Sequence, residues 1–146
     1  MRTSLAGGQK GAAAIEFVAV FVVFFAVFHG LVSYALPMLV LQSFNQASSE
    51  AVRRCVALDP ASANYAGDVQ TLARQVIDQQ LAWMPSSLGF QSASDVQVSV
   101  VDKLLTVSIR YPSERLSRVM PVFKLPLIGD VPRLPEALQA EASLQL

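Results

Sequence analysis

Few side chains in this sequence could take part in chemistry, and they lie far apart along the chain. The only histidine, His29, is inside a long apolar stretch, and the only cysteine, Cys55, follows it. The carboxylates occur singly, no glycine-rich phosphate loop follows a predicted strand, and no Cys or His cluster could ligate a metal. We therefore expect no enzyme active site, no cofactor and no metal. A formal net charge of zero without a basic stripe argues against a nucleic-acid partner.

Glu16 is the side chain whose position most needs an explanation. It is the only acidic residue before Glu50, and it stands at the start of the apolar stretch. Insertion scales put the cost of a charged residue at about 2.5–3.5 kcal/mol at the centre of a membrane helix, and at less near the interface. A partner of opposite charge would offset this cost. If the chain were cut after Gly11, the new amino group of Ala12 would be only four residues away; the alternative is that Glu16 reaches the lipid headgroups.

The element that positions Glu16 is a predicted membrane helix. Residues 17–41 contain no Lys, Arg, Asp or Glu, and about 25 helical residues span about 37 Å, more than the roughly 30 Å hydrocarbon core. We place the N-terminus in the cytoplasm because Arg2 and Lys10 have no acidic neighbour in the leader. An ordinary signal peptide is disfavoured because the apolar run is longer than an h-region of about 7–15 residues. An uncleaved signal anchor stays open.

The segment from Gly11 to Phe17 reads Gly-Ala-Ala-Ala-Ile-Glu-Phe. It resembles the processing site of type IV pilins, in which a prepilin peptidase cuts after Gly and the fifth residue of the mature chain is Glu. Ala12 would then be the first mature residue, and Glu16 stands at the fifth position. Together with the polar helical stretch at 42–51, these residues resemble the TadE family of pilin-like proteins from tight-adherence (Tad, or Flp) pilus systems, over roughly residues 8 to 58.

The resemblance implies a function and a set of partners. The chain would be a minor pilin or pseudopilin of a Tad type IV pilus system, processed by prepilin peptidase between Gly11 and Ala12 and active in pilus assembly or priming, adhesion and biofilm formation. Glu16, followed by Phe17, would neutralise the N-terminus of a neighbouring subunit. Its partners would be other pilin-like subunits and Tad assembly proteins, and it would sit in the bacterial inner membrane with its C-terminal domain in the periplasm, or in an extracellular pilus. The alternative is an unprocessed, single-pass anchored scaffold or binding protein.

Three residues in the middle of the apolar run are candidates for contacts between membrane helices. Gly30 and Ser33 would let another helix approach closely. His29 is expected to form a hydrogen bond with a nearby backbone or hydroxyl group rather than a specific contact with another chain. Pro37 removes one helical hydrogen bond, and we expect a kink there.

The membrane helix is expected to continue outward as an amphipathic arm over residues 42–58. Cys55 should be buried on this arm, with pairing between chains as the alternative. A second helix is predicted to begin with Asp68 as its cap and to stop before Pro85, because apolar residues recur there at spacings of three and four. Trp83 and Met84 are expected in the core.

The outer domain also has a β part. Apolar and polar residues alternate over 96–100, 105–111 and 138–146, with a turn near Asp102 and Lys103, which predicts three antiparallel strands. The proline-rich stretch 112–135, with apolar residues such as Leu116, Leu127 and Ile128, reads as a long loop that covers its own core or, alternatively, docks on another subunit.

The expected fold class is thus α+β: a long N-terminal transmembrane helix that extends into the arm, a second helix and a small three-stranded antiparallel sheet. The expected organisation is a leader at 1–11, a transmembrane helix at 12–41 and an extracytoplasmic domain at 42–146.

Overall fold

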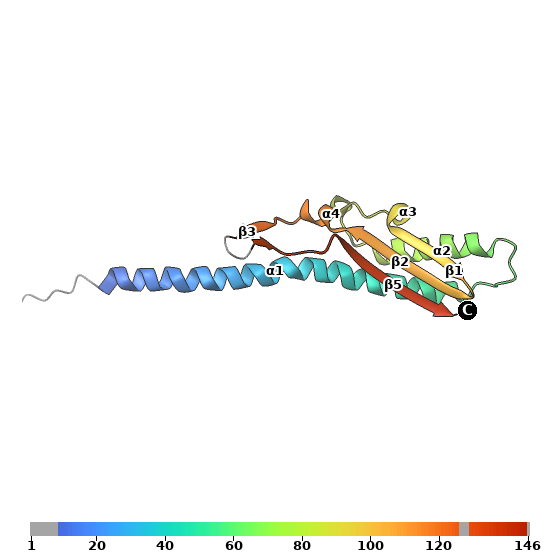
Figure 1. The fold of residues 1–146 in the computed structure, drawn as a ribbon, viewed down its shortest axis with the longest axis horizontal. Coiled ribbons are helices and arrows are strands. Elements are labelled where there is room, and N and C mark those ends of the chain that lie inside the picture. The colour runs from blue at the N-terminus through green and yellow to red at the C-terminus, as the bar shows by residue number, and fades with distance from the viewer. Residues whose placement is uncertain (1–8, 126–128, 146) are drawn as a thin grey trace, which may run out of the picture.

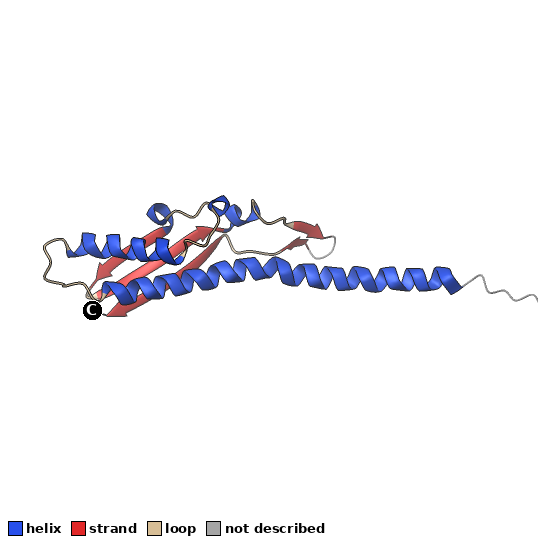
Figure 2. Cartoon of the chain, turned by 180° about the vertical axis from the view of Figure 1, so that it is seen from behind, coloured by secondary structure: helices blue, strands red, loops and turns tan. Residues whose placement is uncertain are grey.

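One helix, α1 (Gln9–Cys55), runs the length of the molecule, and the rest of the chain packs along its second half (Figure 1). The computed structural model describes residues 9–125 and 129–145; of the leader, residues 1–8 lie outside this range. The α+β class and the continuous helix are confirmed. α1 passes through Pro37 without interruption and curves gently (Figures 1 and 2).

The two halves of α1 differ in burial. Every residue from 11 to 28 is exposed, and the first buried position is Ser33. From there the buried residues recur three or four positions apart, as expected for one face of a helix; they include Val40, Phe44, Ala47, Ala51 and Cys55. The amphipathic arm is therefore confirmed. We call the described chain after α1, residues 56–125 and 129–145, the head. The face of α1 that packs against the head begins well before residue 42.

The second helix, α2 (Tyr65–Gln80), packs against α1 through Val69, Ala73, Val76 and Ile77. It begins earlier than predicted, because Asn64 occupies the cap position and Asp68 lies inside the first turn. The Asp68 carboxylate accepts hydrogen bonds from Ser62 Oγ at 3.0 Å and Asn64 Nδ2 at 3.4 Å. The prediction for Trp83 is wrong: the helix has ended, Leu81 takes the buried place, and Trp83 is 47% exposed.

The main sheet has the order β1-β2-β5, all antiparallel, with β1 (Val96–Val101), β2 (Leu104–Pro112) and β5 (Ala137–Gln145). Asp102 and Lys103 join β1 to β2, and both have positive φ, as type I′ hairpin turns require. The three predicted strands and this turn are confirmed.

Burial along the strands is complete only at the centre of the sheet. The four apolar residues of β2 that were expected to face inward, Leu105, Val107, Ile109 and Tyr111, are all buried. Val100 on the edge strand β1 and Leu144 at the end of β5 are 38% and 45% exposed. Leu144 borders an open groove beside Val52 of α1 and Val56, which follows the helix, so helix side chains do not fully cover this end.

The proline-rich stretch is not the long loop that was predicted. It contains α4 (Ser113–Ser117) and a small antiparallel pair of strands, the hairpin of β3 (Phe123–Leu125) and β4 (Gly129–Val131). Residues 126–128 between the two strands, which include Leu127 and Ile128, lie outside the described residues. Two shorter elements, η1 (Ser86–Leu88) and α3 (Ser92–Asp95), lie between α2 and β1. Leu116 and Met120 are buried in the head. This part of the stretch therefore covers its own core, as favoured above.

Candidate processing and assembly site

The predicted cleavage position lies in the first turn of α1. Gly11 and Ala12 are exposed, and a Cβ built on Gly11 would meet no other atom within 4 Å. The first four N–H groups of a helix have no intrahelical partner, and glycine is less favourable in a helix than alanine by about 1 kcal/mol. This turn can therefore unwind at low cost, which a peptidase needs in order to bind the Gly11–Ala12 bond in extended form.

We call residues 11–28 of α1, which are all exposed, the bare half of this helix. Glu16 is an isolated carboxylate on it. It is exposed, and it forms no ion pair or hydrogen bond within the part of the chain that the structure describes. Ala12 is four residues earlier, and side chains with this spacing on a helix have Cβ atoms about 5–6 Å apart. An amino group at Ala12, or one from a neighbouring helix, could therefore approach the Glu16 carboxylate without a change in the fold.

Phe17 begins a row of aromatic rings along one face of α1. Phe17, Phe21 and Phe25 stack in sequence with centroids 6.1 Å apart, and Phe25 stacks on His29 at the same distance. Sequence reasoning missed this row, although aromatic residues spaced by four are its signal. The row gives the exposed half of α1 an apolar ridge that starts beside Glu16.

The row ends where the hairpin meets α1. The rings of His29 and Phe123 in β3 form a T-shaped contact, with centroids 4.6 Å apart and an interplanar angle of 85°. The backbone N–H of Arg133, just after β4, donates to the Tyr34 hydroxyl at 3.0 Å. The hairpin is thus fastened to α1 at the end of the bare half.

The structure brings His29, Gly30 and Ser33 together at this contact. The Ser33 hydroxyl donates to the main-chain carbonyl of His29 at 2.7 Å, and Ser33 is only 4% exposed. His29 Nε2 is buried and has no hydrogen-bond partner among the described residues. Gly30 is partly buried, and a Cβ there would meet nothing within 4 Å. Contacts of these residues with another chain stay a prediction, and Ser33 has little surface left for one.

Comparison with known proteins adds one finding to this geometry. The model of the family described as TadE-like protein matches residues 11–53. Residues 11–53 of α1 are thus similar to the TadE-like family, and we call them the TadE-like segment. No curated protein and no solved structure matches the chain.

The TadE-like segment coincides with α1 almost from end to end and begins at Gly11. It supports involvement in Tad pilus systems in general, and the family is a structural, pilus-related one. The segment is also long and apolar enough to cross a membrane, with a mean hydropathy of 2.5 in its most apolar window, which suggests a single-pass anchor. Within residues 9–125 and 129–145, no three His, Cys, Asp or Glu side chains are grouped as metal ligands would be.

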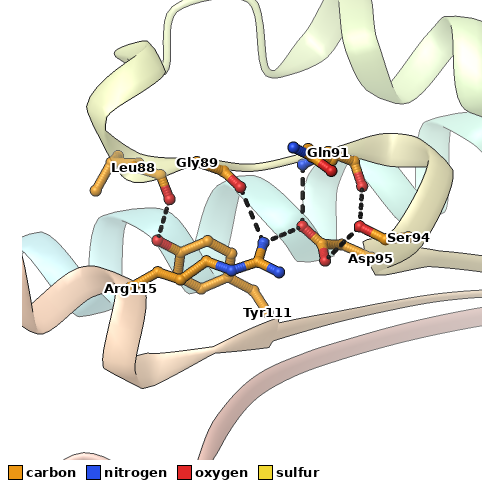
Figure 3. Close-up of polar contacts among 7 residues, drawn as sticks. All are labelled: Leu88, Gly89, Gln91, Ser94, Asp95, Tyr111 and Arg115. Carbon is orange, nitrogen blue, oxygen red and sulfur yellow. Dashed lines mark hydrogen bonds and ion pairs between the residues drawn. The ribbon is translucent and has the colours of Figure 1, made fainter.

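Outside the TadE-like segment, a buried polar cluster holds the head together (Figure 3). Asp95 is 4% exposed and accepts hydrogen bonds from Gln91 N at 2.9 Å, Arg115 Nη1 at 2.8 Å and Ser94 Oγ at 3.1 Å. Arg115 Nη1 also donates to the Gly89 carbonyl at 2.9 Å. The cluster therefore ties α4 to the segment between η1 and β1.

Tyr111 of β2 extends the same cluster. Its hydroxyl donates to the Leu88 carbonyl at 2.7 Å, and the Arg115 guanidinium lies 5.8 Å from its ring centroid. Burial raises the pKa of Tyr111, so the hydroxyl stays protonated and keeps donating at neutral pH. Sequence reasoning missed this cluster, because Asp95 and Arg115 are distant in sequence and share no motif.

Cys55, at the end of α1, is confirmed as buried, with no exposed surface. Its Sγ lies 3.6 Å from the Val69 carbonyl oxygen, to which the thiol donates, and burial raises its pKa. A raised pKa lowers the thiolate fraction at any given pH, and the thiolate is the reactive form.

We expect the native protein in detergent to react with a maleimide at Cys55 at least about a hundredfold more slowly than the urea-unfolded protein, since a buried group reacts only through opening. Time-resolved labelling followed by intact-mass measurement gives both rates. The control is Ser49→Cys combined with Cys55→Ala, which places a thiol at an exposed position of the same helix. Equal rates for the native wild-type protein and this control would contradict the burial.

Proposed function

We propose that this protein is a minor pilin or pseudopilin of a Tad pilus system, cut by prepilin peptidase between Gly11 and Ala12 and active in pilus assembly or priming. The observation that carries the proposal is the bare half of α1, where Glu16 stands exposed, four residues after Ala12, with no partner among residues 9–125 and 129–145. The TadE-like match, which begins at Gly11, supports it. Adhesion and biofilm formation would follow from the pilus.

The proposed mechanism uses the two halves of α1 differently. The bare half would anchor the cut subunit in the inner membrane, with the head in the periplasm. On transfer into a filament, the Phe17–Phe25 ridge would exchange lipid for the helices of other pilin-like subunits, so that packing replaces lipid contact. Glu16 would be neutralised on arrival by the amino group of a neighbouring subunit, which offsets the cost of a carboxylate in an apolar bundle.

The experiment that tests the proposal is N-terminal analysis of the protein from cells that contain an active prepilin peptidase. The wild-type chain is expected to begin at Ala12. Gly11→Leu is expected to abolish cutting, because a side chain at the scissile carbonyl keeps the enzyme from close approach. The substitution makes no clash within the fold, since nothing lies near Gly11.

The matched control is Gly7→Leu, which changes a leader glycine away from the predicted bond and should leave the cut in place. Wild-type protein that keeps residues 1–11 in such cells would overturn the pilin proposal. It would favour the unprocessed anchored scaffold instead. Cutting of the Gly11→Leu variant at the same bond would show that the glycine is not required.

A further inference from the structure

The bare half of α1 has nearly the length of a bilayer core. Residues 12–28 are all exposed and include one charged residue, Glu16. At 1.5 Å per residue they span about 26 Å, close to the roughly 30 Å of hydrocarbon in a typical bilayer. The apolar run continues to residue 41 in the sequence, so length alone does not fix the outer boundary of the span.

The hairpin places charges beside the outer end of this half of α1, where Phe123 contacts His29. Its strands pair Lys124 with Asp130, Arg133 follows two residues after β4 ends, and all three residues are exposed. If the hydrocarbon continued to Leu41, these groups would enter it at about 2.5–3.5 kcal/mol each near the bilayer centre. A boundary near His29 places these groups close to the interface, where the cost is lower. It also places Tyr34, which is 41% exposed, at the level where tyrosines are enriched in membrane proteins.

An apolar groove lies between the hairpin and residues 21–30 of α1. It has a volume of about 450 Å³, and the side chains that line it are almost entirely apolar. The helix contributes Phe21, Val22, Phe25, Ala26, His29 and Gly30, and the hairpin contributes Phe123 and Val131. The groove is continuous with the bare apolar surface of α1, and Phe123 remains 44% exposed beside it. Gly30 lies on the wall of the groove, and a Cβ built there would meet nothing within 4 Å, so a larger side chain has room at this position.

We propose that the hairpin β3–β4 is a lipid-binding element that rests in the headgroup region of the outer leaflet, with one phospholipid acyl chain in the groove between Phe25 and Phe123. The apolar walls match an acyl chain, and Lys124 and Arg133 stand at the level of the lipid phosphates. The hairpin then sets how deeply α1 enters the bilayer. The inference depends on α1 crossing a membrane and holds whether or not the chain is cut after Gly11.

Depth-dependent fluorescence quenching of the full chain tests this proposal. Nanodiscs with one protein copy each are made with phospholipids brominated near the glycerol end or near the methyl end of the acyl chain. The natural tryptophan is removed by Trp83→Phe, and a single tryptophan is placed by Phe123→Trp. We expect several-fold stronger quenching by bromines near the glycerol end. The control is Val56→Trp, at a position that is 42% exposed and directly follows the far end of α1, which should not be quenched.

A second substitution asks whether the groove itself holds the chain. Gly30→Leu fills the groove without a clash inside the protein, and it should reduce the quenching of the Phe123→Trp variant at least about twofold by excluding the acyl chain. Gly11→Leu, on the same helix but outside the groove, should not. Thermal unfolding of each variant shows whether the head is intact, and a variant with a lowered midpoint is replaced by Gly30→Val.

Three results would overturn the proposal. The Phe123→Trp variant could be quenched as little as the Val56→Trp control, which would place the hairpin in water. It could be quenched more by bromines near the methyl end, which would place the hairpin deep in the core. Quenching could also be absent in single-copy discs while Phe25→Cys variants cross-link at high protein density, which would assign the groove to a second copy of this chain.

Discussion

Asp95→Ala is expected to lower the free energy of unfolding of the head by about 3 kcal/mol, because it leaves the Arg115 guanidinium without its carboxylate and Gln91 N without an acceptor. The value lies at the lower end of the range for buried pairs, since the Arg115 side chain is 29% exposed and keeps some water. Urea unfolding in detergent, followed by far-UV circular dichroism, measures the loss.

The chain offers a matched control for this prediction. Glu114 and Arg118 form an ion pair at 3.5 Å with side chains 83% and 72% exposed, so Glu114→Ala should cost less than about 0.5 kcal/mol. A double-mutant cycle with Arg115→Met should give a favourable coupling energy for the Asp95–Arg115 pair. Equal costs for Asp95→Ala and Glu114→Ala would show that the buried cluster does not hold the head together.

Glu16→Gln is expected to leave the amount of cut protein in the membrane unchanged and to lower its recovery in sheared pili at least about tenfold. Without the charge, residue 16 cannot form the ion pair with a neighbouring amino group. A loss of about 1.4 kcal/mol in the free energy of incorporation into the filament lowers incorporation tenfold. Quantitative immunoblots of the membrane and sheared fractions measure both amounts. Glutamine keeps the shape of glutamate, so the bare helix itself should be undisturbed.

The control for this second prediction is Glu50→Gln. Glu50 bonds Arg53 and Arg54 at 2.7 Å on the head half of α1, and these two arginines hold the pKa of Glu50 below its usual value. It lies outside the bare half, so its substitution should not affect recovery in pili. Normal recovery of the Glu16→Gln variant would contradict the charge-neutralisation mechanism while leaving processing at Gly11 untouched.

Sequence patterns predicted the elements whose burial follows from local periodicity. The 3.6-residue period gave α1 and α2, and the two-residue period of β2 correctly gave its buried face from Leu105 to Tyr111. The candidate site was also reached by local reasoning, because Gly11 and Glu16 lie within one short segment. Their proposed roles are tested only by experiment.

The features that sequence reasoning missed depend on contacts between distant residues. The hairpin β3–β4 forms where Phe123 meets His29, and nothing in the local pattern of a proline-rich stretch shows that it will pair with itself and lie on a helix. The Asp95–Arg115 pair likewise forms only after β1, β2 and α4 have assembled. The prediction that Trp83 lies in the core was wrong because the turn after α2 directs Leu81 into the core and leaves Trp83 exposed. Hydrophobicity alone does not show which of these two residues will be buried.

The long side-by-side packing of the head along α1 has a mechanical consequence. From Ser33 to Cys55 the helix is held laterally by α2, β2 and β5 rather than at one end (Figure 2). A pull along the helix axis therefore loads these contacts in shear and all together, whereas a force at right angles would peel them apart one by one. Traction applied to the anchor would thus reach the whole head at once, so that the subunit moves as a rigid rod.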